Sequence, residues 1–494
     1  MAWLIGGILF LILGYFTYGK VVERIVGPDD RPTPALAMPD GVDYVPLPKW
    51  KNMMIQLLNI AGTGPVIGVV LGIKFGKVAL LIIPVGCVLM GAVHDFVCGM
   101  ISVRMKGANL PTIVSRTLGK GYGRVFGWLM GFLLLLCVTV FINVPAKIID
   151  QQWLSQLPFF WPVVGIIFGY YVLATLFPID TIIGRIYPFF SVMLLVGTLA
   201  ILGKILIDGF ADPSILEESA AFVKYKTEVF NANGRSPLFP LLFVTIACGI
   251  ISGFHATQSP IVARTIRSER EGRATFYGMM IAEGVIAMIW ASASLVFYNH
   301  DPSQLSENAA VVLGRISTYL LGSWVGTAAV IAVVVLAITS GDTALRSARL
   351  SLSEMAGIGQ AKLSSRILVC LPLIAIVVGF VWWSSLSPKT FNHIWNYFAW
   401  ANQFVAVTTL MSATVWLLRQ GKGAKCLVTM LPGLFMTTVV VSFILWTSAD
   451  KGQPWGLVPG GLPLGLSIGI GVAVAVVLAA VAVRLGLRKD EPAE

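Results

Sequence analysis

Charged residues are scarce in this chain. Only 12% of its residues are Asp, Glu, Lys or Arg, whereas 56% are hydrophobic, and the mean hydropathy is +0.83. So small a charged fraction cannot cover the surface of a soluble protein. The composition therefore predicts an all-α polytopic membrane protein that is surrounded mainly by the lipid bilayer.

Cysteines and metal-binding motifs are also sparse. The six cysteines lie in or beside apolar segments and form no CxxC pair, which argues against a disulfide framework and against a zinc ribbon. His94, Asp95 and His255 could be grouped as a metal site, but no HExxH or comparable spacing is present. The paired GxGD motif of intramembrane proteases is absent as well. We therefore predict no cofactor and no enzymatic activity.

Long apolar runs fill most of the sequence. The first one, residues 1–17, has neither a basic n-region nor a cleavage site, so we count it as a membrane span and not as a signal peptide. Windows of about 20 apolar residues predict thirteen transmembrane segments, at residues 2–22, 51–73, 78–104, 123–149, 155–177, 187–209, 238–263, 274–299, 322–345, 366–384, 391–418, 426–447 and 461–487.

Basic residues divide unequally between the connections of these segments. When the connections are assigned alternately to two sides, most of the 35 Lys and Arg residues fall in the C-terminus and in the loops after odd-numbered segments. Cytoplasmic loops retain such residues, so the N-terminus is predicted outside and the C-terminus in the cytoplasm. The net charge of +11 then reflects topology, and no nucleic-acid partner is predicted.

Glycines beside polar side chains interrupt the second and seventh segments. The interruptions read NIAGTGP at 59–65 and CGIISGFH at 248–255. Broken helices persist in lipid where the freed backbone groups line a cavity or bind a ligand. Glycines that only allow close helix packing are the alternative. The predicted substrate-binding residues are Asn59, Gly62, Thr63, Gly64, Gly249, Ser252, Gly253, Phe254, His255 and Gln258.

The two interruptions lie five segments apart. Residues 51–209 and 238–418 would thus form two five-helix sets of opposite orientation, an inverted repeat that resembles the LeuT, or amino acid-polyamine-organocation, architecture. Residues 1–50 would add an N-terminal helix and a cytoplasmic loop, 210–237 an external loop, and 419–494 two helices and a cytoplasmic tail. Half-helix N-termini at such breaks suit an anionic or zwitterionic small molecule.

Several short motifs carry a resemblance to a known family. They read GVDYVP at 41–46, AGTGP at 61–65, GAVHDF at 91–96, FPLLFVTIACG at 239–249 and SGFHA at 252–256. With weaker blocks at 277–280, 342–346 and 401–403, they resemble the carbon starvation protein A (CstA) family. The resemblance implies an inner-membrane secondary transporter of peptides or pyruvate, coupled to protons or Na⁺. Amino-acid symport is the alternative, with a channel or an intramembrane enzyme less favoured.

Acidic and histidine side chains within the apolar segments are candidates for coupling, because such groups are rare at membrane depth and usually face a cavity. Asp95 could carry a proton beside His94, or it could form a structural ion pair with Arg104 or with a neighbouring helix. Glu283 could carry a proton, or it could be a neutral acid bonded to a backbone group.

The ninth segment offers a second group of candidates for coupling. Thr339, Asp342 and Thr343 fall on one helical face beside Ser340, and oxygens grouped in this way suit Na⁺ or a proton. Alternatively, residues 340–342 could cap a solvated helix end. Asn402 and Gln403 of the eleventh segment are expected to form hydrogen bonds between helices.

Overall fold

The computed structural model describes residues 1–62, 64–153, 160–178, 183–307, 309–386, 388–451 and 456–488. Every regular element in these ranges is a helix, as the composition predicts. The main helices are α1 (Ala2–Phe16), α2 (Tyr18–Val26), α3 (Pro34–Ala37), α4 (Lys49–Ile60), α5 (Val69–Gly72), α6 (Val78–Gly86), α7 (Ala92–Arg104), α8 (Leu110–Leu118), α9 (Lys120–Trp153), α10 (Phe160–Leu176), α11 (Ile183–Ala211), α12 (Ala220–Tyr225), α13 (Phe243–Ile246), α14 (Gly253–Ala263), α15 (Gly278–His300), α16 (Ala309–Ala356), α17 (Leu363–Ser385), α18 (Pro388–Arg419), α19 (Leu427–Trp446) and α20 (Leu464–Gly486).

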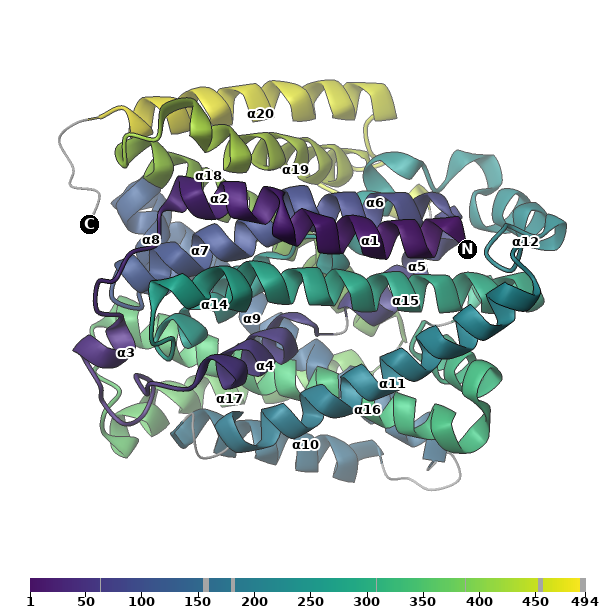
Figure 1. The fold of residues 1–494 in the computed structure, drawn as a ribbon, viewed down its shortest axis with the longest axis horizontal. Coiled ribbons are helices and arrows are strands. Elements are labelled where there is room, and N and C mark those ends of the chain that lie inside the picture. Colours follow the sequence, from purple (N-terminus) through teal and green to yellow (C-terminus); the bar gives the residue numbers. More distant parts are fainter. Residues whose placement is uncertain are drawn as a thin grey trace.

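Most long helices run roughly along the long axis of the molecule (Figure 1). The chain begins at the end that carries α12, and α20 finishes at the opposite end, near α3 and α8 (Figure 1). The arrangement gives the molecule two ends, here called the α12 end and the α8 end.

Ten helices in the described ranges are long and apolar enough to cross a membrane, and the bent pair Lys49–Ile60 and Gly64–Phe75 adds an eleventh span. These spans match eleven of the predicted segments, so the protein is a multi-pass membrane protein. The other two predicted segments correspond to the shorter apolar helix Phe160–Leu176 and to the interrupted stretch from α13 to α14. The count of thirteen crossings and the inverted repeat stay predictions.

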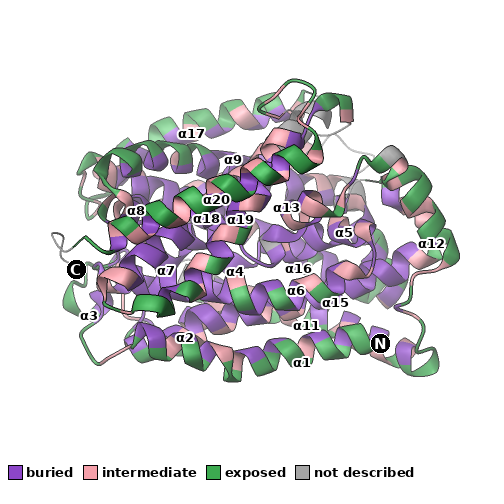
Figure 2. Ribbon diagram, turned by 90° about the horizontal axis from the view of Figure 1, so that it is seen from above, coloured by how far each residue is buried: buried purple, intermediate pink, exposed green. Residues whose placement is uncertain are grey.

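The apolar surface of the bundle lies on its outer helices. Leu13 of α1, Leu371 of α17 and Val476 of α20 are each more than half exposed, and Figure 2 shows the exposed residues along these helices. By contrast, 89% of the most apolar 18-residue stretch of Glu269–His300 is buried inside the bundle. For Leu464–Gly486 the corresponding share is 22%. An exposed apolar belt around a buried centre is the arrangement that lipid requires.

The two predicted interruptions are real breaks near the centre of the bundle. α4 ends at Ile60, and the chain resumes as the short π-helical turn η1 (Gly64–Gly68), with a bend of 52° between the two halves. In the second stretch the 3-10 turn η7 (Ala247–Gly249) follows α13, and α14 begins only at Gly253.

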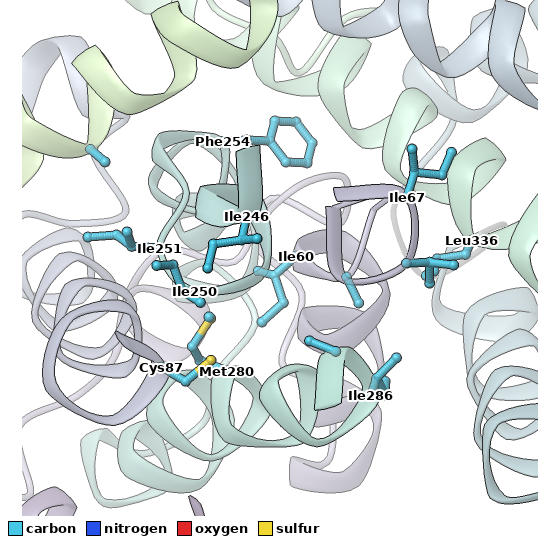
Figure 3. Packing of buried hydrophobic residues seen from close by; sticks show 14 of the residues in the cluster. Ile60, Ile67, Cys87, Ile246, Ile250, Ile251, Phe254, Met280, Ile286 and Leu336 are labelled. Carbon is cyan, nitrogen blue, oxygen red and sulfur yellow. The ribbon is translucent and has the colours of Figure 1, made fainter. Parts of the chain in front are cut away.

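Buried side chains pack tightly around these breaks. Ile250 lies next to Cys87 and Met280, and Ile60 points into the same apolar space (Figure 3). Cys87 belongs to a π-helical turn, η3 (Cys87–Gly91), that interrupts the third predicted segment. Cys87, Cys98, Cys137, Cys370 and Cys426 are all buried free thiols, which supports their predicted role as packing residues.

Candidate functional site

The two breaks meet at a cavity of about 220 Å³ that extends toward the α12 end. Its wall near the breaks combines backbone from both broken helices with the aromatic rings of α9 and α18. The rings of Phe141 and Phe254 lie 5.7 Å apart, and those of Phe141 and Phe398 lie 6.0 Å apart. The lining residues are Ile60, Gly62, Gly64, Gly68, Leu71, Lys74, Phe75, Phe141, Phe230, Ser236, Leu241, Val244, Thr245, Ser252, Phe254, His255, Trp395, Phe398, Ala399, Asn402 and Phe443.

Half of the predicted substrate-binding residues line this cavity, namely Gly62, Gly64, Ser252, Phe254 and His255. Asn59, Gly249, Gly253 and Gln258 are buried behind its wall and do not line it. Thr63 lies outside the described residues. Whether these residues bind substrate stays a prediction.

Gly253 has a packing role that the sequence-based hypothesis of ligand contact did not assign to it. A Cβ atom there would lie 2.3 Å from the Asn402 carbonyl oxygen and 2.6 Å from the Ala406 nitrogen of α18. A Cβ atom at Gly249 would lie 3.3 Å from the Val69 side chain and 3.5 Å from the Pro65 Cα atom. For these two glycines the alternative of close helix packing describes the structure.

Asn402 of α18 forms hydrogen bonds with backbone and side-chain groups at the second break. Its side-chain oxygen accepts hydrogen bonds from the Phe254 N–H (2.6 Å) and from the Ser252 hydroxyl (3.2 Å). Its amide nitrogen also lies 2.8 Å from Ser252 Oγ. The Cys87 thiol donates to the Gly249 carbonyl at 3.2 Å. Asn402 therefore bonds between helices as predicted, and it caps the start of α14.

The first break has fewer fixed partners. Ser340 of α16 donates to the Leu58 carbonyl at 3.1 Å, one turn before the break. The amide groups of Gln56 and Asn59 are completely buried, and neither has a hydrogen-bond partner among the described residues. Buried polar groups normally have partners. Unpaired amides next to a cavity are groups that a ligand or water can satisfy.

A buried chain of histidines and carboxylates begins at the cavity wall. His255 Nδ1 lies 3.0 Å from Asp95 Oδ2, and Asp95 Oδ1 lies 2.8 Å from His94 Nδ1. On its other side, His255 Nε2 lies 3.6 Å from Glu283 Oε2. All four side chains are almost completely buried, and they come from α7, α14 and α15. The structure thus gathers three predicted coupling residues around the predicted substrate residue His255.

The alternatives for the two acids of this chain have different outcomes. An ionic contact between Asp95 and a neighbouring helix is present, because His255 of α14 lies 3.0 Å from its carboxylate. Arg104 pairs with Glu269 at 2.9 Å, and so it is not the partner of Asp95. The Glu283 carboxyl oxygens have no hydrogen-bond partner among the described residues, so the expected backbone bond is not seen there.

The candidates on α16 do not converge on one point. The hydroxyls of Thr339 and Thr343 donate to carbonyls of their own helix. Asp342 instead accepts a hydrogen bond from the Tyr187 hydroxyl of α11. α16 continues to Ala356, so a solvated helix end at Asp342 is wrong. Of the four candidates on α16, Ser340 is the one that bonds next to a helix break, through the Leu58 carbonyl.

Neither metal-site nor nucleophile geometry accompanies these residues. No group of three or more His, Cys, Asp or Glu side chains in the described part of the chain could hold a metal ion. A Gly-x-Ser-x-Gly sequence at 465–469 lies inside α20, where the Ser467 hydroxyl donates to the Pro463 carbonyl at 3.1 Å. A serine nucleophile of that motif would need an exposed strand-to-helix turn.

Several residues of the site carried no clear sequence signal. Phe141, Trp395 and Phe398 line the cavity, but aromatic residues within apolar segments are indistinguishable by pattern from core or lipid-facing ones. Among the lining residues that were not predicted, Lys74 had a usable signal, since it is a basic residue at the end of a broken apolar segment.

Ion pairs close the bundle at the α8 end. Asp43, in the loop before α4, accepts hydrogen bonds from Arg346 (2.7 Å) and Arg349 (3.3 Å) of α16. Burial alone would raise the pKa of Asp43, but Arg349, Arg346 and Arg264 together lower it to about 2. Arg264 also stacks over Tyr44, with 5.1 Å between guanidinium and ring centroid. The carboxylate is therefore ionised at neutral pH, and this buried cluster is fully charged.

Comparison with known proteins agrees with the resemblance seen in the motifs. The family model described as carbon starvation protein CstA matches residues 1–168, 149–319 and 299–442. An uncharacterized membrane protein of Haemophilus influenzae is 40% identical over 352 residues, which cover 62% of this chain and 94% of that protein.

Two further relatives are named as transporters. The pyruvate/proton symporter BtsT of Escherichia coli is 30% identical over 54% of this chain and 45% of its own length. The peptide transporter CstA of Bacillus subtilis is 28% identical over 58% of this chain and 57% of its own length. The chain therefore spans about half the length of these two transporters.

Solved structures of a manganese transporter from Eremococcus coleocola share the fold, with a TM-score of 0.53 at 14% sequence identity. The match covers 91% of this chain and 98% of that one. At this identity the likeness concerns the fold alone. The family match, by contrast, spans most of the sequence, and the chain belongs to the carbon starvation protein CstA family.

Proposed function

We propose that this protein is a secondary active transporter in the cytoplasmic membrane that carries small carboxylate-bearing nutrients such as pyruvate or short peptides. The observation that carries the proposal is the cavity at the meeting point of two broken helices. Broken helices are the recurrent means by which transporters expose backbone groups to substrate. The transport functions of relatives in the family support the same conclusion.

The two ends of the bundle support a transport cycle in which the site opens to one side at a time. The cavity extends toward the α12 end, and the Asp43 cluster closes the α8 end. Closing one end while the site is reached from the other is the requirement of alternating access.

The basic residues of the α8 end support its placement in the cytoplasm. Cysteines introduced at Asp301 and at Lys422 should then react with an impermeant thiol reagent from opposite sides of sealed cells, Asp301 from outside. Labelling of both from one side would refute this orientation.

We assign the coupling ion as a proton carried by the chain of His94, Asp95, His255 and Glu283. Two imidazoles alternate with two carboxylates along this chain, and each of these groups can bind and release a proton. His255 connects the chain to the cavity, because it lines the wall and contacts Asp95. Sodium would need several oxygen ligands. At the first break the Ser340 hydroxyl and the Leu58 carbonyl already bond each other, so the amide oxygens of Gln56 and Asn59 would have to supply further ligands.

Uptake into proteoliposomes tests the function. The purified protein should accumulate labelled pyruvate or a dipeptide saturably when a pH gradient, acidic outside, is imposed. A response to a sodium gradient alone would move the coupling role to Ser340. Non-saturable flux that ignores both gradients would indicate a channel and overturn the proposal.

Replacing Asp95 by Asn tests the coupling. Asp95→Asn should abolish accumulation against a gradient but retain exchange of substrate at equilibrium, because only the ion-linked change of state is lost. Asp212→Asn is the control, since that carboxylate lies in the exposed loop after α11 and bonds Ser214. Full uphill transport by Asp95→Asn would remove the chain from the mechanism.

A further inference from the structure

The described wall of the cavity contains one lysine and no acidic residue. Lys74 lies in the 3-10 turn η2 (Ile73–Phe75), at the end of the second half of the first broken helix, and it lines the cavity. The residue is only 8% exposed. None of the other described lining residues is Asp, Glu or Arg.

Lys74 has no anionic partner although two carboxylates lie near the same turn. Glu217 pairs with the exposed Lys77, and Glu218 pairs with Lys226. Glu218 also accepts a hydrogen bond from the Lys77 backbone N–H at 2.7 Å. For Lys74 itself, no hydrogen bond or ion pair with any described residue is found. The neighbouring acids are thus already engaged with other lysines.

A buried cation without a partner is costly, because transfer of an ion out of water is repaid only by a close counter-charge or by hydrogen bonds. The cost is removed when a ligand brings an anion into the cavity. We propose that Lys74 selects the substrate by its charge, and that the preferred ligand is a small monocarboxylate without an ammonium group, such as a 2-oxo acid. This inference rests on the proposed transport function and narrows its substrate class.

The rest of the wall fits the same ligand. Phe75 and Phe230, whose rings lie 5.0 Å apart, offer apolar surface for a short carbon chain at the same part of the wall as Lys74. An ammonium group, as in a peptide or amino acid, would find no carboxylate in the described wall, because Asp95 and Glu283 lie behind His255. The volume of about 220 Å³ is below the roughly 300–1,000 Å³ typical of sites for drug-sized ligands.

Binding measurements on the purified full chain in nanodiscs test this inference. The probes are pyruvate, its neutral methyl ester and glycylglycine, and binding is followed by calorimetry. Wild-type protein should bind pyruvate at least about 10-fold more tightly than the ester, which is the scale of a charge-assisted hydrogen bond. Lys74→Gln should lose this discrimination, and Lys74→Arg should keep most of it.

Lys77→Gln is the matched control. Lys77 stands three residues further along, its side chain is 37% exposed, and it pairs with Glu217 outside the cavity, so this variant should bind like the wild type. Melting temperatures of all variants show whether a loss of binding reflects unfolding. If Lys74→Gln does not fold, Lys74→Arg provides the test. A retained preference of Lys74→Arg for pyruvate over the ester supports selection by positive charge, and a lost preference contradicts it.

Each contrary result has a distinct meaning. Equal affinity of the wild type for pyruvate and its ester, or unchanged discrimination in a folded Lys74→Gln, would overturn the role of Lys74 and leave transport intact. Tighter binding of glycylglycine than of pyruvate would overturn the monocarboxylate preference. Loss of the proposed function itself would appear separately, as absence of saturable uptake of all three compounds into proteoliposomes.

Discussion

The two helix breaks look alike in sequence but are held in different ways. At the second break, Asn402 bonds Ser252 and the Phe254 N–H, and the Cys87 thiol bonds the Gly249 carbonyl. A Cβ at Gly91 would lie 2.1 Å from the Ile250 carbonyl oxygen, so helix η3 touches this backbone directly. The freed groups there already have protein partners.

The first break is looser. One hydroxyl, from Ser340, bonds the Leu58 carbonyl, and the buried amides of Gln56 and Asn59 have no described partner. Gly62 faces the tips of two side chains, Phe141 and Ser340, and not backbone. Because side chains adjust more easily than backbone, we infer that the second break is a fixed frame and the first break is the side that adapts to ligand.

Replacing Gly253 should have the largest effect on stability. Gly253→Ala places a methyl group against the α18 backbone at 2.3 and 2.6 Å, and overpacking of this kind costs roughly 1–3 kcal/mol or more. We expect a lower melting temperature and less monodisperse protein. Gly131→Ala is the control, because a Cβ there meets nothing within 4 Å. If Gly253→Ala melted like the wild type, the second break could not be called a fixed frame.

Replacing Asn402 should have a smaller but clear effect. Asn402→Ala removes the cap of α14 and the bonds to Ser252, and loss of such a cap costs about 1–2 kcal/mol. Thermal unfolding in detergent measures the change. The adjacent Gln403 provides a control, since its amide has no partner in the described structure and Gln403→Leu sacrifices no bond there. Equal stability of the two variants would contradict the capping role.

The sequence predicted the parts of this site that depend on local pattern. Apolar length located the spans, and glycines beside polar residues located both breaks, one after Ile60 and one before Gly253. The sequence could not predict which neighbour satisfies each break. Asn402 lies about 150 residues from Ser252, and Asp95 lies 160 residues from His255, so these pairs depend on tertiary packing that no local pattern records.

The same limit explains the errors at Gly253 and Asp342. A glycine that approaches a ligand and one that approaches a helix look identical in sequence, and only the position of α18 distinguishes them. Asp342 shares a helical face with Thr339 and Thr343, as periodicity predicts. However, the two threonine hydroxyls donate to carbonyls of their own helix, and the Asp342 carboxylate accepts a hydrogen bond from Tyr187. Periodicity predicts a shared face, but it does not predict a shared ligand.

The smallest effect on stability is expected at the first break, and it provides the sharpest test of the comparison. Gly62→Ala brings a methyl group to 3.0 Å from the Phe141 ring and 3.2 Å from the Ser340 hydroxyl, contacts that side-chain rotation relieves at a cost of about 1 kcal/mol or less. Melting should change little, but pyruvate binding should weaken, because the new methyl group enters the wall of the cavity. A loss of stability as large as that of Gly253→Ala, with unchanged affinity, would mean that both breaks are fixed frames and that substrate adapts to the protein elsewhere.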